Sequence, residues 1–159
     1  MHGPEGHQLS ASQEDYLETI LALEAEHGSA RVRDIAARLG VAMPSVTEAL
    51  RNLAKRGLVN YSPYEHVTLS EHGRRLATGV RKRHGVLRRF FGEVLGVDDA
   101  LADANACRIE HAVDDAVLAR LTGLMDYLGQ PGPRGGDPLS ELRQFYSQRA
   151  DTPTPGRPQ

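Results

Sequence analysis

The stretch RDIAARLGVAMPSVTEALRNLAKR, residues 33–56, decides how the first half of this chain folds. Apolar side chains recur at helical spacing over residues 33–39, and Gly40 ends this short helix because glycine readily takes the left-handed backbone conformation. A second apolar stripe predicts a helix over residues 44–56, where Pro44 fits the first turn. The two helices are separated by a very short connection, which indicates a helix-turn-helix pair.

The segments on either side extend this pair into a larger motif. Residues 10–27 predict a helix that either Ser10 or Ser12 caps. Residues 58–61 and 66–69 have the pattern of two short strands joined by a turn. Helix, short helix, turn, helix and hairpin is the order of a winged helix-turn-helix.

A second group of helices follows the hairpin. Helical periodicity predicts helices over residues 70–95, 98–111 and 114–128. The last of these carries an apolar stripe that we interpret either as a contact between two copies of the chain or as part of the core; it consists of Val117, Leu121, Leu124 and Leu128. The fold class is mainly α: a winged helix-turn-helix domain followed by an α-helical dimerisation domain. The expected divisions are a flexible N-terminus (1–9), the winged helix-turn-helix (10–72), the helical metal-binding and dimerisation domain (73–128) and a Gly/Pro-rich tail (129–159) with a short helix near 138–148.

Charge is distributed unevenly along the chain, although the net charge is only −2. Residues 31–91 hold thirteen basic side chains against four acidic ones, a balance of +9, whereas both flanking segments are acidic. A basic block of this size is typical of a nucleic-acid-binding face. The single cysteine cannot form an internal disulfide, and no apolar run exceeds four residues, so we expect a cytoplasmic protein without a membrane span.

The helix over residues 44–56 is expected to enter the major groove of DNA with its N-terminal residues against the bases. Val46 and Leu50 face inward in this interpretation, and polar side chains face the groove. Glu48 has two equal interpretations: it accepts from a cytosine amino group, or it is a surface charge paired with Arg51 or Asn52. The candidate DNA-contacting residues are Arg31, Arg33, Arg38, Pro44, Ser45, Thr47, Glu48, Arg51, Lys55, Tyr64 and His66.

Six potential metal ligands stand at spacings that place them on common faces of three predicted helices. Two carboxylates are three residues apart on the first helix, a histidine lies midway along the long helix, and a Cys-x-x-Glu-His sequence occupies positions i, i+3 and i+4 of a later helix. Thiolate, imidazole and carboxylate together suit a divalent transition metal. Taken singly, Cys107 is also interpretable as a small buried hydrophobe and His84 as an exposed histidine. The candidate ligands are Asp15, Glu18, His84, Cys107, Glu110 and His111.

Three segments of the chain resemble the diphtheria toxin repressor family: QEDYLETI at residues 13–20, RH at 83–84 and ACRIEH at 106–111. The similarity extends over about residues 10–128. The family comprises bacterial metal-dependent transcriptional repressors, with iron-dependent and manganese-dependent branches. The resemblance implies a winged-helix DNA-binding domain, a helical dimerisation domain, and a metal site formed by the six candidate ligands.

Within that family the chain resembles a hybrid of the two branches. Asp15 and Glu18 match the manganese branch, whereas Cys107 matches the iron branch. The ancillary site of the iron branch uses Glu and His at the positions of Arg88 and Asp103, so an ancillary site of that composition is not expected here. The C-terminal β-barrel of the iron branch is not expected either, because the chain ends too soon.

The function predicted from these patterns is metal-activated repression of iron or manganese homeostasis genes, by a homodimer on an inverted repeat in double-stranded DNA. Fe²⁺ is the first choice of metal and Mn²⁺ the second, with Co²⁺, Ni²⁺ or Zn²⁺ as surrogates. An enzyme using the same ligands is disfavoured, because a catalytic metal keeps an open position and six side chains leave little room. A thiol-based redox regulator acting through Cys107 is the other rival, although Glu110 and His111 beside it favour ligation.

Overall fold

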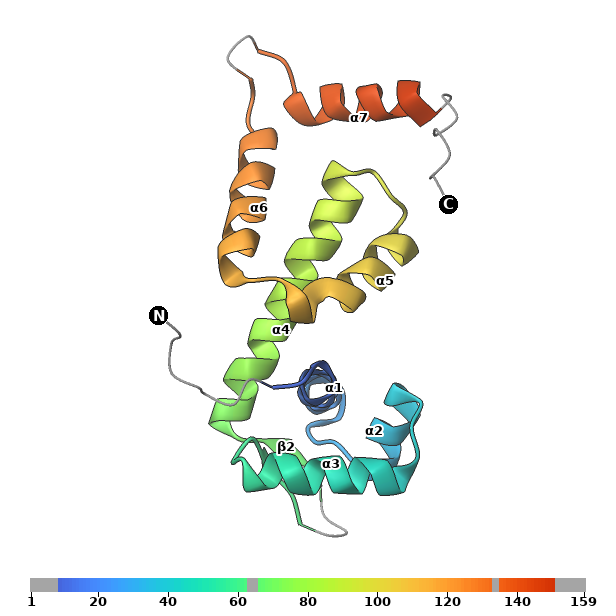
Figure 1. The fold of residues 1–159 in the computed structure, drawn as a ribbon, viewed down its shortest axis with the longest axis vertical. Helices are drawn as coiled ribbons and strands as arrows, with labels where there is room; N and C mark the ends of the chain where they lie inside the picture. Colours follow the sequence, from blue (N-terminus) through green and yellow to red (C-terminus); the bar gives the residue numbers. More distant parts are fainter. Residues whose placement is uncertain (1–8, 63–65, 133–134, 151–159) are drawn as a thin grey trace, which may run out of the picture. The chain divides into compact units, whose positions relative to one another are not determined.

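A computed structural model describes residues 9–62, 66–132 and 135–150, and its helices follow one another in the order that the sequence predicts (Figure 1). The chain divides into two units, Met1–Lys82 and Arg83–Gln159. The boundary falls within one helix, α4 (Glu71–Arg89). Within the described residues, no helix combines the length and hydrophobicity needed to cross a membrane.

The first unit opens with α1 (Ala11–His27), whose N-terminus is closed by a capping box. The Ser10 hydroxyl accepts from the Gln13 backbone N–H at 3.2 Å, and the Gln13 side chain accepts from the Ser10 N–H at 3.1 Å. The short α2 (Val32–Leu39) ends at Gly40, whose φ of +66° is the left-handed conformation predicted for it. The next helix, α3 (Met43–Lys55), follows after a connection of three residues and completes the predicted pair.

The hairpin is present but shorter than predicted. Strands β1 (Val59–Asn60) and β2 (Thr68–Leu69) pair antiparallel, and the Asn60 amide donates to the Thr68 hydroxyl at 3.1 Å. A bridge that the sequence did not predict adds Ala30 to this sheet, paired with Val67 by two backbone hydrogen bonds of 3.0 and 2.8 Å. A single bridged residue between two helices leaves no period-2 pattern, so no sequence signal marks it.

The core of the first unit is built by the apolar stripes that predicted its helices. α1, α2 and α3 pack on one another, and the hairpin closes one side of this core. Val46 and Leu50 are fully buried, which confirms their inward orientation on α3. The other fully buried large side chains of this core, among the described residues, are Leu17, Ile20, Ile35, Leu53, Leu58 and Val67.

Ser70 connects the start of α4 to the base of the hairpin through hydrogen bonds. Its backbone N–H donates to the Leu58 carbonyl at 3.0 Å, and its hydroxyl donates to the Gly57 carbonyl at 2.7 Å. The same hydroxyl accepts from the Gly73 N–H at 3.0 Å, which satisfies a donor of the first helical turn. Gly73 is buried here, and a Cβ on it would collide with the Leu58 carbonyl. Only glycine therefore fits this crossing without a shift of the backbone.

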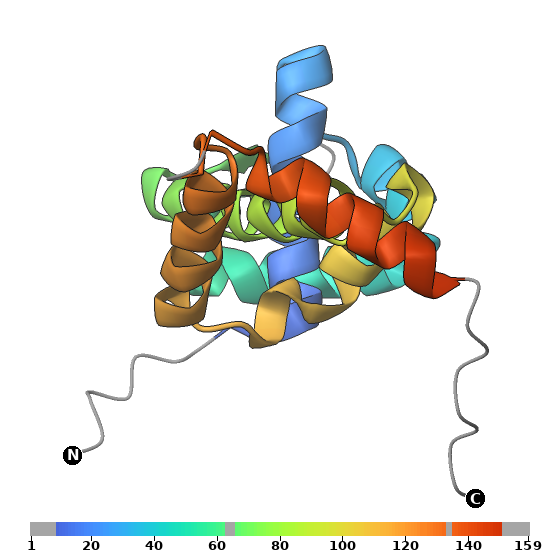
Figure 2. The same cartoon turned by 90° about the horizontal axis from the view of Figure 1, so that it is seen from above.

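In the second unit, the predicted helix over 70–95 does not continue as an α-helix to its end. α4 stops at Arg89 and continues as a π-helical turn, η1 (Phe90–Val94). α7 (Pro138–Ala150) crosses over this end of α4 (Figure 2), and the Arg143 guanidinium donates to the Glu93 carbonyl through two nitrogens, at 3.1 and 2.9 Å. These two bonds satisfy a carbonyl at the end of the helix.

The predicted helix over 98–111 also changes its geometry near its end. α5 (Asp99–Ile109) begins at Asp98, whose carboxylate accepts from the Leu101 N–H at 3.0 Å, and it gives way to a 3₁₀ turn, η2 (Glu110–Ala112). The expectation that the Cys-x-x-Glu-His sequence occupies one α-helical face is therefore wrong, because the cysteine lies on α5 and the other two residues lie on η2.

α6 (Asp115–Leu128) buries a different pair of residues from the stripe that the sequence indicated. Leu118 and Met125 are its buried residues, whereas Val117 and Leu124 of the predicted stripe are 50% and 43% exposed. The other two residues of the stripe, Leu121 and Leu128, are half-buried, and Leu121 packs against the core cluster of the second unit. The stripe is therefore divided between the core of one chain and an exposed apolar surface, and the contact between two copies stays a prediction.

Candidate functional site

The face of α3 that is turned away from the core carries the polar side chains predicted to read DNA. The exposed residues of this face are Pro44, Ser45, Glu48, Arg51 and Lys55. Thr47 is half-buried, and its hydroxyl donates to the Met43 carbonyl one turn earlier at 3.1 Å. That hydroxyl therefore already has a partner within the helix.

The basic side chains around α2 differ in the hydrogen bonds and ion pairs that they make within the protein. Arg31 is exposed at the start of the helix, and the exposed Arg33 donates from Nε to the neighbouring Asp34 carboxylate at 3.2 Å. Arg38 instead donates from both terminal nitrogens to the two oxygens of the Glu26 carboxylate, at 2.9 and 2.7 Å. This bidentate hydrogen bond lowers the pKa of Glu26 below its ordinary value. Part of the Arg38 charge is thus balanced within the protein.

Of the two candidates on the hairpin, the structure describes one. His66 is exposed, and its Nδ1 lies 2.8 Å from the Ser29 hydroxyl in the connection between α1 and α2. Tyr64 lies outside the described residues.

Two residues of α1 that sequence reasoning missed connect it to the end of α3, to β2 and to α4. The Gln13 amide oxygen accepts from the Arg56 guanidinium at 2.7 Å, at the end of α3. Glu24, only 8% exposed at its side chain, accepts from the Leu69 backbone N–H at 3.0 Å and from Arg74 at 2.7 Å. An acid four residues after the buried Ile20, on the apolar face of the helix, was the signal that pointed to such a role.

The two candidate ligands of the first unit, Asp15 and Glu18, lie one turn apart on α1, as predicted, and both are half-buried. The remaining four belong to the second unit. His84 lies on α4 and Cys107 on α5, whereas Glu110 and His111 lie on η2. Cys107 is exposed, so its interpretation as a small buried hydrophobe is wrong.

Glu110 is the centre of the polar cluster in the second unit. Its side chain is only 1% exposed, although it carries a carboxylate. One carboxylate oxygen lies 2.7 Å from His84 Nδ1, and the other lies 3.4 Å from His111 Nε2. Burying a carboxylate is costly unless it is paired with a cation or coordinates a metal. This chain places an imidazole at each oxygen.

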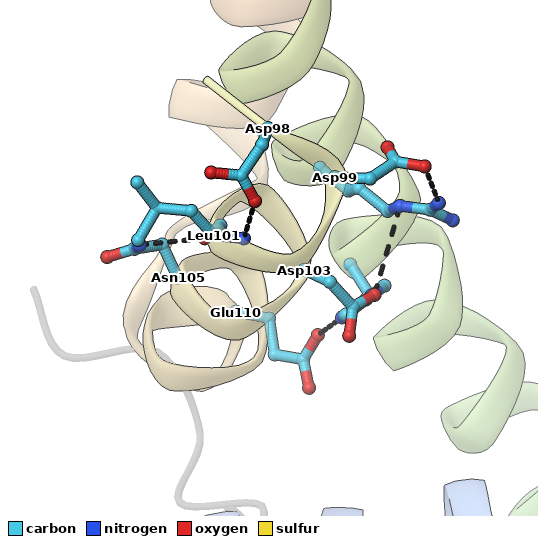
Figure 3. A network of polar contacts seen from close by, with 8 residues as sticks. Asp98, Asp99, Leu101, Asp103, Asn105 and Glu110 are labelled. Carbon is cyan, nitrogen blue, oxygen red and sulfur yellow. Dashed lines mark hydrogen bonds and ion pairs between the residues drawn. The ribbon is translucent and has the colours of Figure 1, made fainter.

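Both ring nitrogens of His84 lie within hydrogen-bonding distance of a carboxylate. Nδ1 faces Glu110, and Nε2 lies 3.0 Å from the Asp103 carboxylate on α5. Burial of the ring lowers the pKa of His84, but the hydrogen bonds to Asp103 and Glu110 outweigh it, so that the pKa is raised above its ordinary value. Figure 3 shows this network, in which Asp103 and Glu110 point toward the same region between α4 and α5.

The donor set of this cluster fits a divalent transition metal. Imidazole nitrogen and carboxylate oxygen are ligands that Fe²⁺, Mn²⁺, Co²⁺, Ni²⁺ and Zn²⁺ accept, and here they converge on a buried carboxylate. A hairpin-bearing helix-turn-helix on the same chain as such a cluster defines a class of protein, the metal-responsive DNA-binding regulators.

Comparison with known proteins identifies the family. Residues 8–67 match the model described as iron dependent repressor, N-terminal DNA binding domain, and residues 70–137 match iron dependent repressor, metal binding and dimerisation domain. The chain belongs to the iron-dependent repressor family, to which the diphtheria toxin repressor is related. Proteins of this family bind DNA through the first domain, bind divalent iron or manganese, and dimerise through the second.

Relatives from both metal branches are similar to the chain. The transcriptional regulator MntR of Escherichia coli O6:H1 is 41% identical over 66% of this chain and 67% of its own length. The diphtheria toxin repressor of Corynebacterium glutamicum is 33% identical over 93% of this chain and 64% of its own length. A solved structure described as a manganese-dependent transcriptional repressor complex with manganese is 30% identical, with a TM-score of 0.65, over 78% of this chain and 60% of that one.

These comparisons bear on three predictions made from the sequence. They confirm the resemblance to the diphtheria toxin repressor family and the winged helix-turn-helix followed by a helical domain. They also agree with the prediction that the chain is not an enzyme, since the reported relatives are transcriptional regulators. The chain spans about two thirds of the length of these two relatives.

Proposed function

We propose that this chain is a cytoplasmic, homodimeric repressor that binds an inverted-repeat operator in double-stranded DNA when a divalent metal is bound. The genes it controls would be those of iron or manganese homeostasis. Fe²⁺ is the proposed physiological metal and Mn²⁺ the alternative, with Co²⁺, Ni²⁺ and Zn²⁺ as surrogates in the test tube. The order rests on Cys107, because a thiolate is a softer ligand than the carboxylate of the manganese branch.

One observation carries the proposal: the buried Glu110 carboxylate lies between two imidazoles, those of His84 and His111. In the metal-free protein, the raised pKa of His84 favours the protonated ring, which balances the charges of Glu110 and Asp103. A bound divalent cation would supply positive charge to the same carboxylate. His84 would then act as a neutral ligand, and its proton would leave to solvent.

The proposed ligand set draws on both units of the chain. Glu110, His111, His84 and Cys107 would come from the second unit, and Asp15 and Glu18 on α1 would complete it. The support for the last two is the match of their spacing to the manganese branch, together with their position one turn apart on α1.

Contacts within the first unit suggest how ligands on α1 would act on DNA. The Gln13–Arg56 hydrogen bond ties α1 to the end of α3, and Glu24 ties it to β2 through Leu69. Restricting α1 therefore restricts both elements that face DNA. Operator affinity would rise to the extent that the metal is bound more tightly in the DNA-competent arrangement than in the others.

The proposed dimer contact is the exposed stripe on α6. Val117 and Leu124 expose large apolar surfaces there, and burial against a second copy would remove them from water. Two copies related by a two-fold axis would present two α3 helices to successive turns of the major groove, which is why an inverted repeat is the expected target.

Metal-dependent selection of DNA tests the proposal directly. The metal-free protein would be incubated with a pool of random duplexes under anaerobic conditions, with Fe²⁺, Mn²⁺, Co²⁺ or chelator, and the retained sequences determined. We expect an inverted repeat to be enriched only with metal, and metal analysis to give a fixed number of ions per chain. Equal enrichment with chelator would contradict metal activation.

Variants separate the ligand cluster from the general stability of the fold. Glu110→Ala and His111→Ala are expected to lose activation by every metal, because both remove a donor of the buried cluster. Arg89→Gln is the matched control, since Arg89 forms an exposed ion pair with Glu93 one turn away, at 3.1 Å, outside the ligand cluster. It is expected to retain activation.

A further inference from the structure

The second unit contains a series of charged side chains with no assigned role, which leads from His84 through Asp103 to Arg88. We propose that Asp103 is a positioning residue of the metal centre, which fixes the imidazole of His84 so that Nδ1 is the ligand atom, and that Arg88 holds Asp103 in this role. The inference rests on the proposed metal function, and it assigns a role to two residues outside the ligand set.

The orientation of His84 follows from its two neighbours. Nδ1 lies 2.7 Å from the buried Glu110, and Nε2 lies 3.0 Å from the Asp103 carboxylate. A metal shared with Glu110 must approach the ring from the Nδ1 side. Nε2 then keeps its hydrogen and donates it to Asp103. A carboxylate in this position fixes the tautomer of a ligating histidine and raises its basicity.

Asp103 needs support, because its side chain is 57% exposed and would otherwise rotate freely into solvent. Arg88 supplies that support from one turn beyond His84 on α4. Its Nε lies 3.8 Å from the same Asp103 oxygen that faces His84, and its terminal nitrogen donates to Asp99 at 3.1 Å. Figure 3 shows Asp99 and Asp103 on the same side of α5, facing α4.

The Arg88 guanidinium also prevents Asp103 from acting as a metal ligand. Two carboxylates one turn apart on α5, beside an imidazole, are a donor set that attracts a second divalent cation. Arg88 places a permanent positive charge between them, so a second cation there would be repelled. Asp103 is thereby kept as a hydrogen-bond acceptor for His84 instead of becoming a ligand itself.

The test measures how tightly the wild type and two Asp103 variants bind Co²⁺. The Zn²⁺-loaded wild type is used for NMR. Asp103→Ala is expected to weaken Co²⁺ binding by about 10- to 100-fold, the usual effect of losing an outer carboxylate, without changing the number of ions bound. Asp103→Asn keeps an oxygen acceptor for the Nε2 hydrogen and should recover part of that loss. The visible absorption band of the Co²⁺ protein should keep its intensity in both variants, because the coordinating atoms are unchanged.

The decisive readout is the ring nitrogen that carries the metal. Long-range ¹H–¹⁵N correlation spectra of the Zn²⁺-loaded wild type should show Nδ1 bound and Nε2 protonated at His84. Metal on Nε2 would overturn the inference, and so would an Asp103→Ala variant that binds Co²⁺ as tightly as the wild type. A wild type that binds neither ion would instead refute the proposed function.

Arg88→Gln tests the supporting role with a neighbouring control. It is expected to weaken Co²⁺ binding less than Asp103→Ala does, and to allow a second ion to bind at millimolar Co²⁺, because the positive charge between Asp99 and Asp103 is gone. Arg89→Gln removes an adjacent charge from the same helix without touching this network, and it should change neither quantity. Identical effects of the two substitutions would refute a specific role for Arg88.

Discussion

Replacing Gly73 by alanine is expected to destabilise the first unit, against the usual preference of helices for alanine. The added Cβ would collide with the Leu58 carbonyl, which belongs to the backbone and cannot rotate away. Either α4 or the base of the hairpin must move. The hydrogen bonds that Ser70 makes to Leu58 and Gly57 then lengthen together.

The magnitude follows from these contacts. Two weakened hydrogen bonds cost about 1 kcal/mol each, and forcing a carbon into a filled space costs about 1–3 kcal/mol more. The higher helix propensity of alanine relative to glycine stabilises the fold by about 1 kcal/mol. The net loss is therefore about 2–4 kcal/mol, which lowers the midpoint of urea unfolding by roughly 1–2 M for an m-value of about 2 kcal/mol/M.

Gly79→Ala is the matched control on the same helix, because nothing lies within 4 Å of the position its Cβ would take. It gains helix propensity without a collision and should raise stability by up to about 1 kcal/mol. Urea unfolding followed by circular dichroism measures both variants. The reasoning is refuted if Gly73→Ala is as stable as the wild type, or if both substitutions destabilise equally.

Three further outcomes are expected. Cys107→Glu should narrow or reverse the preference for Fe²⁺ over Mn²⁺ in anaerobic DNA binding while keeping metal dependence; an unchanged ratio would show that the metal preference lies elsewhere. Arg51→Ala should flatten the dependence of log DNA affinity on log salt by about 0.9 per lost phosphate contact, leaving the preferred sequence the same; an unchanged slope would remove Arg51 from the interface. The lowered pKa of Glu26 means that its bond to Arg38 adds stability above the ordinary carboxyl pKa and loses it as the pH falls through the lowered value. The difference in urea midpoint between the wild type and Glu26→Gln should therefore be largest near neutral pH and vanish in acid, whereas a constant difference would contradict this assignment.

Hydrophobic periodicity and helix caps were sufficient to predict the order of the helices. Ser10 and Gly40 delimit helices as expected, and Val46 and Leu50 are buried as expected, because capping and amphipathicity depend on neighbours within one or two turns. The same local logic failed where a helix changes type. The π-helical turn η1 and the 3₁₀ turn η2 follow helical patterns that look uninterrupted in the sequence.

Which candidate residues act together was decided by tertiary packing. The sequence by itself determined that the chain carries metal-ligand side chains and a basic block, because residue types and their spacing are local properties. Packing decided that His84 meets both Glu110, 26 positions away, and Asp103. It also decided that Glu24 is bonded to a strand 45 positions further along. Such contacts depend on how α4 and α5, or α1 and β2, lie against each other, and no periodicity along the chain encodes which polar side chains face one another once their helices have packed.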